Sequence, residues 1–283
     1  MTSILSRLID LLAPRLCLAC GQRLTPSEHT LCATCNLHLP RTGFQAMPTD
    51  NEMARMFWGR IPVERCGALF FYRAGSQPSH LIYHLKYNDH PEAGIDLGRM
   101  VAREYAAAGF FDGIQLIVPV PLAPARQHQR GYNQSRQIAL GISEVTGIKV
   151  AADVVYRKTF NTSQTHQQRW DRTANVEDVF RLLRPEKVTG CHILLVDDVS
   201  TTGATLCACA QALAGAGEVS VSILTLGFAK PCRTPLFCPT VGSRRYRCVG
   251  QRWRLQVVNA TFTALIMAFS LDKYSNGSEK RQG

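Results

Sequence analysis

Two adjacent carboxylates and a run of hydroxyl side chains stand out in residues 193–205. Asp197 and Asp198 directly follow a short, branched apolar run, which has the length and composition of a buried parallel strand. A hydroxyl-rich turn around Gly203 comes next, and a helical pattern begins near Ala204. Open α/β sheets bind ligands beyond the carboxyl ends of their strands, and helix N-termini attract anions. The pattern therefore predicts a cradle for a sugar phosphate.

The turn after the acidic pair offers backbone N–H groups and hydroxyls to an anion. The residues expected to hold the phosphate are Val199, Ser200, Thr201, Thr202, Gly203, Ala204 and Thr205. A solvated turn is the alternative, because Asp, Ser, Thr and Gly are ordinary turn residues. The chain contains neither G-x-x-x-x-G-K-[ST] nor G-x-G-x-x-G, which disfavours a P-loop NTPase and a dinucleotide-binding fold.

The same stretch resembles the 5-phosphoribosyl-1-diphosphate (PRPP) binding motif of type I phosphoribosyltransferases. That resemblance implies that Asp197 and Asp198 hold the ribose hydroxyls and that residues 200–205 hold the 5′-phosphate. Mg²⁺ is expected to accompany the diphosphate, since it is a hard cation that takes phosphate oxygens.

A second anion-binding element follows the apolar, proline-interrupted run at 116–122. Arg126 and Arg130 lie in an expected basic loop, and a helix is expected over 136–145. Two arginines, a glycine turn and a helix N-terminus suit a second anionic group, although such loops are often only solvated. With the cradle they predict a diphosphate site, in which Gly131, Asn133 and Gln134 also contact the ligand.

A long polar segment at 158–175 predicts a lid over this site, because long loops in compact domains are often functional. Its cations Lys158, Arg169 and Arg172, together with the preceding Arg157, would neutralise a departing diphosphate when the lid closes. The catalytic set predicted from the sequence is Asp197, Asp198, Arg126 and Arg130.

Four of the eleven cysteines form two C-x-x-C pairs that are separated by eleven residues. This spacing is typical of a structural zinc site with a closed tetrahedron of thiolates. The predicted ligands are Cys17, Cys20, Cys32 and Cys35. Disulfides or a redox C-x-x-C are the alternatives, but an expected cytoplasmic location opposes disulfides and a redox motif explains only one pair.

Alternating strand and helix patterns predict an α/β fold with a mostly parallel sheet flanked by helices. An N-terminal helix and the zinc module are expected over 1–40, a connector over 41–62 and the phosphoribosyltransferase-like domain over 63–230. No apolar run reaches the length of a membrane span, and the N-terminus lacks the unbroken apolar core of a signal peptide.

Several motifs together resemble the ComF family of phosphoribosyltransferase-like bacterial proteins. They are the four-cysteine module, Leu85-Lys86-Tyr87, Val118-Pro119-Val120-Pro121-Leu122, Arg130-Gly131-Tyr132-Asn133-Gln134-Ser135, the segment 164–175 and residues 196–203. The resemblance covers residues 1 to about 229. It implies PRPP binding, phosphoribosyl transfer to an unidentified acceptor, and an association with DNA uptake and competence. The alternative is a non-catalytic protein that senses PRPP, or that binds single-stranded DNA with the basic groove and aromatic side chains such as Tyr132 and Trp170.

The tail, residues 231–283, departs from that family pattern. It has a net charge of +7, whereas residues 1–230 have +4, and it carries an apolar stretch at 257–271. We expect a poorly ordered segment that derives from read-through or a frameshift. A genuine basic extension that contacts membrane or nucleic acid is the alternative.

Overall fold

The computed structural model describes residues 14–87, 90–158, 179–230, 245–249 and 252–256. The expected N-terminal helix and most of the expected lid, with Arg169 and Arg172, lie outside the described residues. Contacts divide the chain into two units, Met1–Pro231 and Cys232–Gly283. In the second unit, β8 (Arg245–Val249) pairs antiparallel with β9 (Arg252–Gln256).

A five-stranded sheet forms the centre of the first unit, and every strand pair in it is parallel. The strand order is β1-β7-β6-β2-β3. Its strands are β1 (Cys66–Phe71), β2 (Leu116–Pro119), β3 (Lys149–Val150), β6 (His192–Ser200) and β7 (Ser220–Phe228). A separate antiparallel pair joins β4 (Val155–Arg157) to β5 (Phe180–Leu182). The parallel sheet confirms the predicted fold class.

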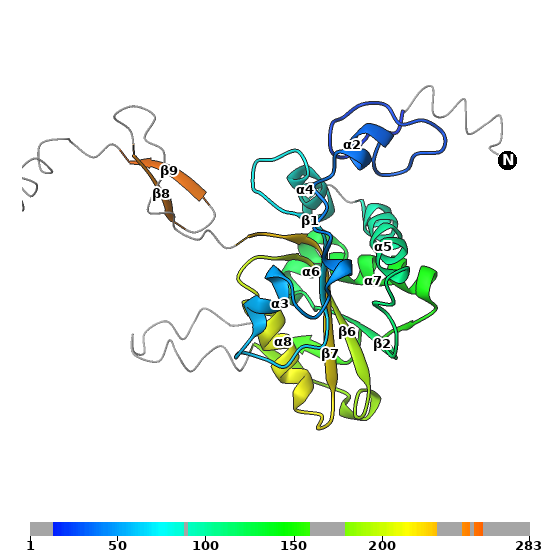
Figure 1. Cartoon of the computed structure of the whole chain (residues 1–283), viewed down its shortest axis with the longest axis vertical. Coiled ribbons are helices and arrows are strands. Elements are labelled where there is room, and N and C mark those ends of the chain that lie inside the picture. Colours follow the sequence, from blue (N-terminus) through cyan, green and yellow to red (C-terminus); the bar gives the residue numbers. More distant parts are fainter. Residues whose placement is uncertain (1–13, 88–89, 159–178, 231–244, 250–251, 257–283) are drawn as a thin grey trace, which may run out of the picture. The chain divides into compact units, whose positions relative to one another are not determined.

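Helices cover both faces of the sheet, with α5 and α7 on one side and α3 and α8 on the other (Figure 1). Their bounds are α3 (Glu52–Phe57), α5 (Pro91–Ala106), α7 (Gln134–Thr146) and α8 (Ala204–Ala214). Side chains alternate across a strand, so Ile193 and Leu195 of β6 join the core on the α8 side while Leu194 and Val196 join the core on the α5 and α7 side. Burial on both faces explains why β6 is a continuous apolar run.

Shorter elements complete the unit: α2 (Ala33–Leu37), η1 (Phe44–Ala46), α4 (Ser79–Tyr87), α6 (Pro124–Arg130) and η3 (Pro185–Lys187). The segment 41–62 is more than a connector, because Met53 and Phe57 of α3 are fully buried in the core. Asn51 caps this helix by accepting hydrogen bonds from the N–H groups of Met53 and Ala54.

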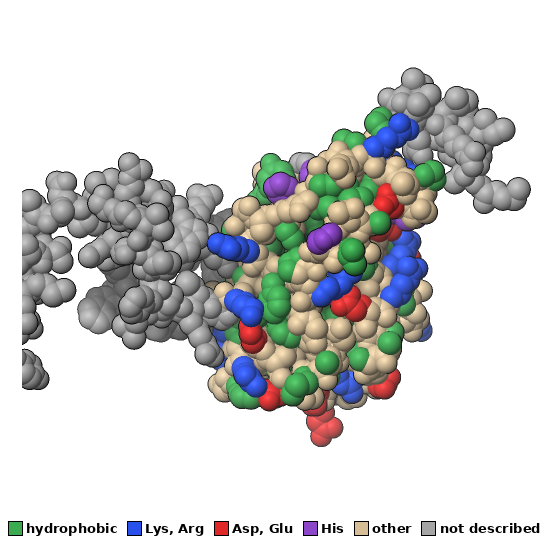
Figure 2. Space-filling model, turned by 45° about the horizontal axis from the view of Figure 1, so that its top comes forward, with side chains coloured by type: hydrophobic (Ala, Val, Ile, Leu, Met, Phe, Trp, Pro, Cys, Tyr) green, Lys and Arg blue, Asp and Glu red, His purple; other side chains and the backbone are tan. Residues whose placement is uncertain are grey.

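The surface carries mixed charge. Lys and Arg side chains are scattered over the face in Figure 2, and several lie beside Asp or Glu, in agreement with the mild net charge of residues 1–230. Among the described residues, no helix combines the length and the apolar character needed to cross a bilayer.

Candidate functional site

The acidic pair lies where the chain connections of the sheet diverge. β6 leads through α8 to β7 on one side, whereas the neighbouring β2 leads through α6 and α7 to β3 on the other. Ligands of open α/β sheets bind in the crevice at such a point, beyond the carboxyl ends of the strands. Asp197 and Asp198 belong to the last part of β6, and Val196 pairs with Pro119, the last residue of β2. The acidic pair therefore lies at the edge of the sheet where a ligand crevice is expected.

Both carboxylates have protein partners. Asp197 Oδ1 accepts hydrogen bonds from Ser135 Oγ at 2.9 Å and from the N–H of Asp198 at 2.9 Å. Asp198 is 8% exposed, and its Oδ2 lies 3.0 Å from Nζ of Lys86. Burial and the charge of Asp198 raise the pKa of Asp197 to about 7, against the lowering effects of its hydrogen bonds and of Lys86. The pair thus carries less than two full negative charges near neutral pH.

The predicted phosphate cradle forms the start of α8. A hollow of about 30 Å³ is lined by Asp197 and residues 199–206. Gly203 has φ 70°, and a Cβ there would lie 2.8 Å from Cε1 of Phe57, so the turn needs glycine both for its backbone and for its close contact with α3. Arg60 Nη1 donates to the carbonyl of Thr202 at 2.8 Å, which ties the segment after α3 to the same turn.

Ser200 differs from the other hydroxyl residues of the cradle. Its side chain is buried, and among the described residues its Oγ has no hydrogen-bond partner. An unsatisfied buried hydroxyl costs about 1–3 kcal/mol, so a ligand that gave it a partner would recover this free energy. Thr201 and Thr205 are half-buried and Thr202 is exposed, and all three line the hollow.

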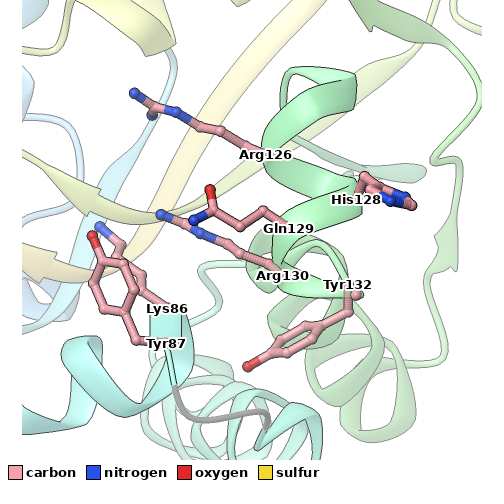
Figure 3. A pocket seen from close by; sticks show the side chains of 8 residues that line it. Lys86, Tyr87, Arg126, His128, Gln129, Arg130 and Tyr132 are labelled. Carbon is pink, nitrogen blue, oxygen red and sulfur yellow. The ribbon is translucent and has the colours of Figure 1, made fainter.

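The segment expected as a basic loop is a helix, α6, and the loop prediction is wrong. Pro124 at its first turn fixes a helical φ, and Gly131 at φ 75° ends it in the left-handed conformation. The helix places Arg126 and Arg130 four residues apart on one face. Figure 3 shows both arginines extending in the same direction from α6, while His128 points away from them.

These arginines line a pocket of about 720 Å³. Lys86 and Tyr87 at the end of α4 form part of the same wall (Figure 3). The Arg130 guanidinium lies 5.4 Å from the centre of the Tyr87 ring, a cation–π distance. The pocket therefore presents three cations next to the acidic pair.

Asn133 and Gln134, which follow α6, form hydrogen bonds with neighbouring protein groups. Asn133 accepts from the N–H of Ser135 as the N-cap of α7 and donates to the carbonyl of Val120 at 3.0 Å. Gln134 is buried, and its Oε1 accepts from Arg130 Nη1 at 3.0 Å. In the structure these two predicted ligand-binding side chains bond to the protein, so their contact with a ligand stays a prediction.

Of the predicted lid cations, the structure describes Arg157 and Lys158. The backbone N–H of Lys158 donates to the carbonyl of Val179 at 2.9 Å. The nearby Arg157 of β4 is half-buried, and burial together with the charge of Arg126 lowers its pKa. The positive charge of Arg126 thus opposes that of Arg157.

The four predicted zinc ligands converge. Their sulfur atoms all lie within 4.8 Å of one another, and none of these cysteines forms a disulfide. Cys20 Sγ and Cys32 Sγ are 3.8 Å apart, close to the sulfur–sulfur spacing of a tetrahedron with Zn–S bonds of about 2.3 Å. Burial raises the pKa of Cys17, but backbone N–H groups, including that of Cys32, outweigh it and lower the value to about 7. The cluster can hold a metal ion.

Sequence reasoning gave no role in the site to Lys86, Tyr87 and Ser135. Lys86 and Tyr87 belong to one of the motifs that resemble the ComF family, and Ser135 ends another. Membership of these motifs was the only signal in the sequence for a role of these residues in the site. Their contacts join residues far apart in the chain, such as Lys86 with Asp198 and Ser135 with Asp197. Local pattern contains no information on such pairs.

Comparison with known proteins agrees with these features. Residues 104–236 match the phosphoribosyl transferase domain family. The DNA utilization protein YhgH of Salmonella typhimurium is 30% identical over 235 residues, which cover 79% of this chain and 99% of that protein. Competence protein F of Haemophilus influenzae is 34% identical over 93 residues, 32% of this chain and 41% of that protein.

Among solved structures, a glutamine phosphoribosylpyrophosphate amidotransferase from B. subtilis is 22% identical with a TM-score of 0.36, and the match covers 50% of this chain and 30% of that one. The match, which spans nearly all of YhgH, confirms the family resemblance that the motifs indicated. The chain belongs to the ComF/YhgH family of proteins with a phosphoribosyl transferase domain.

Proposed function

We propose that this protein binds PRPP with Mg²⁺ and transfers its phosphoribosyl group to an acceptor. One juxtaposition carries the proposal: the acidic pair on β6 lies between a hydroxyl-lined helix N-terminus and a pocket with three cations. PRPP has a 5′-phosphate, a ribose diol and a diphosphate in the same order. The site offers each of them a group of matching chemistry.

The 5′-phosphate would bind at the start of α8, where the N–H groups of the turn and the hydroxyls of Thr201, Thr202 and Thr205 are available. Asp197 and Asp198 would accept hydrogen bonds from the ribose hydroxyls. Mg²⁺, bound to oxygens of the ligand, would offset part of the diphosphate charge. The protein thereby fixes C1 of the ribose relative to α6.

Departure of the diphosphate from C1 leaves an oxocarbenium-like sugar and a more negative leaving group. Arg126 and Arg130 face the pocket and would stabilise this negative charge, an effect that is typically worth about 3–4 kcal/mol for each well-placed donor. Gln134 and Tyr87 hold Arg130 before the ligand arrives, so little reorganisation is needed. Catalysis would depend on positioning and electrostatics.

Calorimetry with PRPP and Mg²⁺ tests the binding step. The wild-type protein is expected to bind, and the double variant Asp197→Asn with Asp198→Asn is expected to lose at least tenfold in affinity. Unchanged affinity of the double variant would refute the proposed site. Diphosphate release, screened over bases and amines, tests whether binding leads to transfer.

We further propose that the metal of the cysteine cluster is zinc in a structural role, because four thiolates leave no open coordination position. The metal site requires reduced thiols, which suits the cytoplasm. The names of two relatives, the DNA utilization protein YhgH and Competence protein F, lead us to propose a role in DNA use and competence.

Single-stranded DNA binding is a second candidate function, either beside PRPP binding or in place of catalysis. Tyr83 and Tyr87 of α4 are 56% and 63% exposed, and their ring centres are 5.0 Å apart. Exposed aromatic rings beside Arg130 could stack bases. If they do, DNA affinity should fall steeply with salt and in the variant Tyr83→Ala, whereas PRPP affinity should depend less on salt. Absence of DNA binding would exclude this function, and DNA affinity that is independent of both salt and Tyr83 would exclude binding through these rings.

A further inference from the structure

Lys86 occupies a position between the two halves of the proposed site. It is the penultimate residue of α4, and its Nζ lies 3.0 Å from Asp198 Oδ2. The Lys86 side chain retains 27% exposure, whereas that of Asp198 retains 11%. A carboxylate with so little contact with water needs a compensating cation, and Lys86 provides it.

The same ammonium group also belongs to the cationic pocket. Lys86 lines the pocket together with Arg126 and Arg130, and Figure 3 shows all three side chains extending into one space from α4 and α6. No Asp or Glu is among the described residues that line this pocket. An anion that enters it therefore meets Lys86 directly.

Lysine has three N–H donors, and the ion pair with Asp198 occupies one of them. The other two donors can bind a phosphate oxygen without breaking the ion pair. Lys86 would then contact both Asp198 and the diphosphate. Because Asp198 would bind the ribose hydroxyls, the diphosphate and these hydroxyls would lie on opposite sides of the Lys86 nitrogen.

We propose that Lys86 binds the diphosphate of the ligand directly and, through Asp198, fixes its position relative to the ribose. This inference rests on the proposed function. It gives Lys86 a role in substrate binding that is separate from the role of the two arginines, because Lys86 comes from α4 and is also paired with the acidic residue.

The position of Lys86 is itself supported from two directions. Tyr132 Oη donates to the carbonyl of Leu85 at 2.7 Å, which joins the end of α4 to the segment that follows α6. The fully buried Leu81 and Leu85 anchor the opposite face of α4 in the core. Lys86 is therefore carried by a fixed backbone, as a binding residue should be.

Calorimetric titration of the full chain with inorganic pyrophosphate and Mg²⁺ tests the inference. Wild-type protein and Lys86→Arg, which keeps the charge, are expected to bind within about threefold of each other. Lys86→Met is expected to bind at least tenfold more weakly. Lys149→Met serves as the matched control, because Lys149 is exposed on β3 and lines none of the pockets described above; its affinity should stay within twofold of the wild type.

The variant Asp198→Asn separates direct from indirect action. It removes the ion pair but retains the ammonium group, so pyrophosphate should still bind within threefold of the wild type. The double variant Lys86→Met with Asp198→Asn leaves no unpaired carboxylate buried, so it can be tested even if Lys86→Met alone fails to fold. It should bind pyrophosphate as weakly as a folded Lys86→Met variant.

Two results would overturn the inference: affinity of Lys86→Met within twofold of the wild type, or a loss in Asp198→Asn as large as that in Lys86→Met. A wild-type protein that binds neither PRPP nor pyrophosphate would instead refute the proposed function. The two failures are thus distinguishable.

Discussion

The carboxyl group of Asp197 lies where burial, the neighbouring charge of Asp198 and a hydrogen bond from Ser135 meet. Burial dominates and raises its pKa to about 7. The folded protein therefore holds a proton that the unfolded chain releases near pH 3.8. The resulting stabilisation is complete below pH 3.8 and is lost as pH rises through about 7.

The variant Asp197→Asn should remove this pH dependence, because the amide oxygen can still accept from Ser135 and does not titrate. Relative to the wild type, the variant should gain stability as pH rises from 5 to 8, by about 1 kcal/mol or more, since one pKa unit corresponds to about 1.4 kcal/mol. Denaturant unfolding at pH 5, 6.5 and 8 measures the difference. A difference that stays constant with pH would contradict the raised pKa.

Gly203 combines a left-handed backbone with a close contact to Phe57, and the substitution Gly203→Ala should cost about 2–4 kcal/mol. Gly190→Ala is the matched control. Gly190 has a similar φ of 74°, but no atom lies within 4 Å of the position that a Cβ would take there, so about 1–2 kcal/mol is expected. Equal losses in denaturant unfolding would mean that the contact with Phe57 contributes nothing.

At the scale of elements, β6 and the start of α8 were predictable from the sequence, but α6 was not. The start of α8 at Ala204 follows from the hydroxyl-rich turn, and β6 follows from its buried apolar run. By contrast, α6 buries none of its residues, so it has no apolar periodicity to detect. Its only local signals are Pro124 at the start and Gly131 at the end.

The helix α4 connects the cysteine module to the site. Gln77 Nε2, just before α4, donates to Cys35 Sγ at 3.4 Å, and His80 Nδ1 lies 3.3 Å from the carbonyl oxygen of Ala19. The other end of the helix carries Lys86. The metal module and the acidic pair are therefore joined by nine residues of helix.

Removal of the metal should loosen α4 and weaken PRPP binding. The expected results are release of about one equivalent of zinc to a chelator, faster amide exchange in residues 79–87 and at least threefold weaker PRPP binding. Exchange in β7 should change less, because both neighbours of that strand, β1 and β6, belong to the sheet. Unchanged exchange in α4 after zinc release would contradict the coupling.

At the scale of the whole molecule, the contacts that complete the site were beyond prediction from the sequence. Local pattern indicates which residues are polar at a strand end, but not that Lys86 meets Asp198 or that Arg60 meets Thr202. The close contact of Phe57 with Gly203 likewise joins a segment predicted as a connector to the cradle. Such contacts follow from the packing of the complete fold, and the local residue patterns of a single sequence do not reveal that packing.

Truncation after Lys230 should leave the first unit stable. Contacts separate Met1–Pro231 from Cys232–Gly283, and β7 ends at Phe228 within the retained part. The melting temperature of the truncated chain is expected to stay within about 2 °C of the full chain, as a calorimetric scan would measure. A fall of more than 5 °C, about 1–2 kcal/mol for a chain of this size, would show that the tail stabilises the fold.

The strand order has a consequence for biosynthesis. β1 is made early, yet within the described residues its neighbour in the sheet is β7, the last strand of the first unit. The hydrogen-bonding edge of β1 must therefore wait for more than a hundred later residues to leave the ribosome, and contacts of such high sequence separation form slowly. A nascent chain that stalls before Ser220 would expose that edge, and chaperones should engage it at this stage of synthesis.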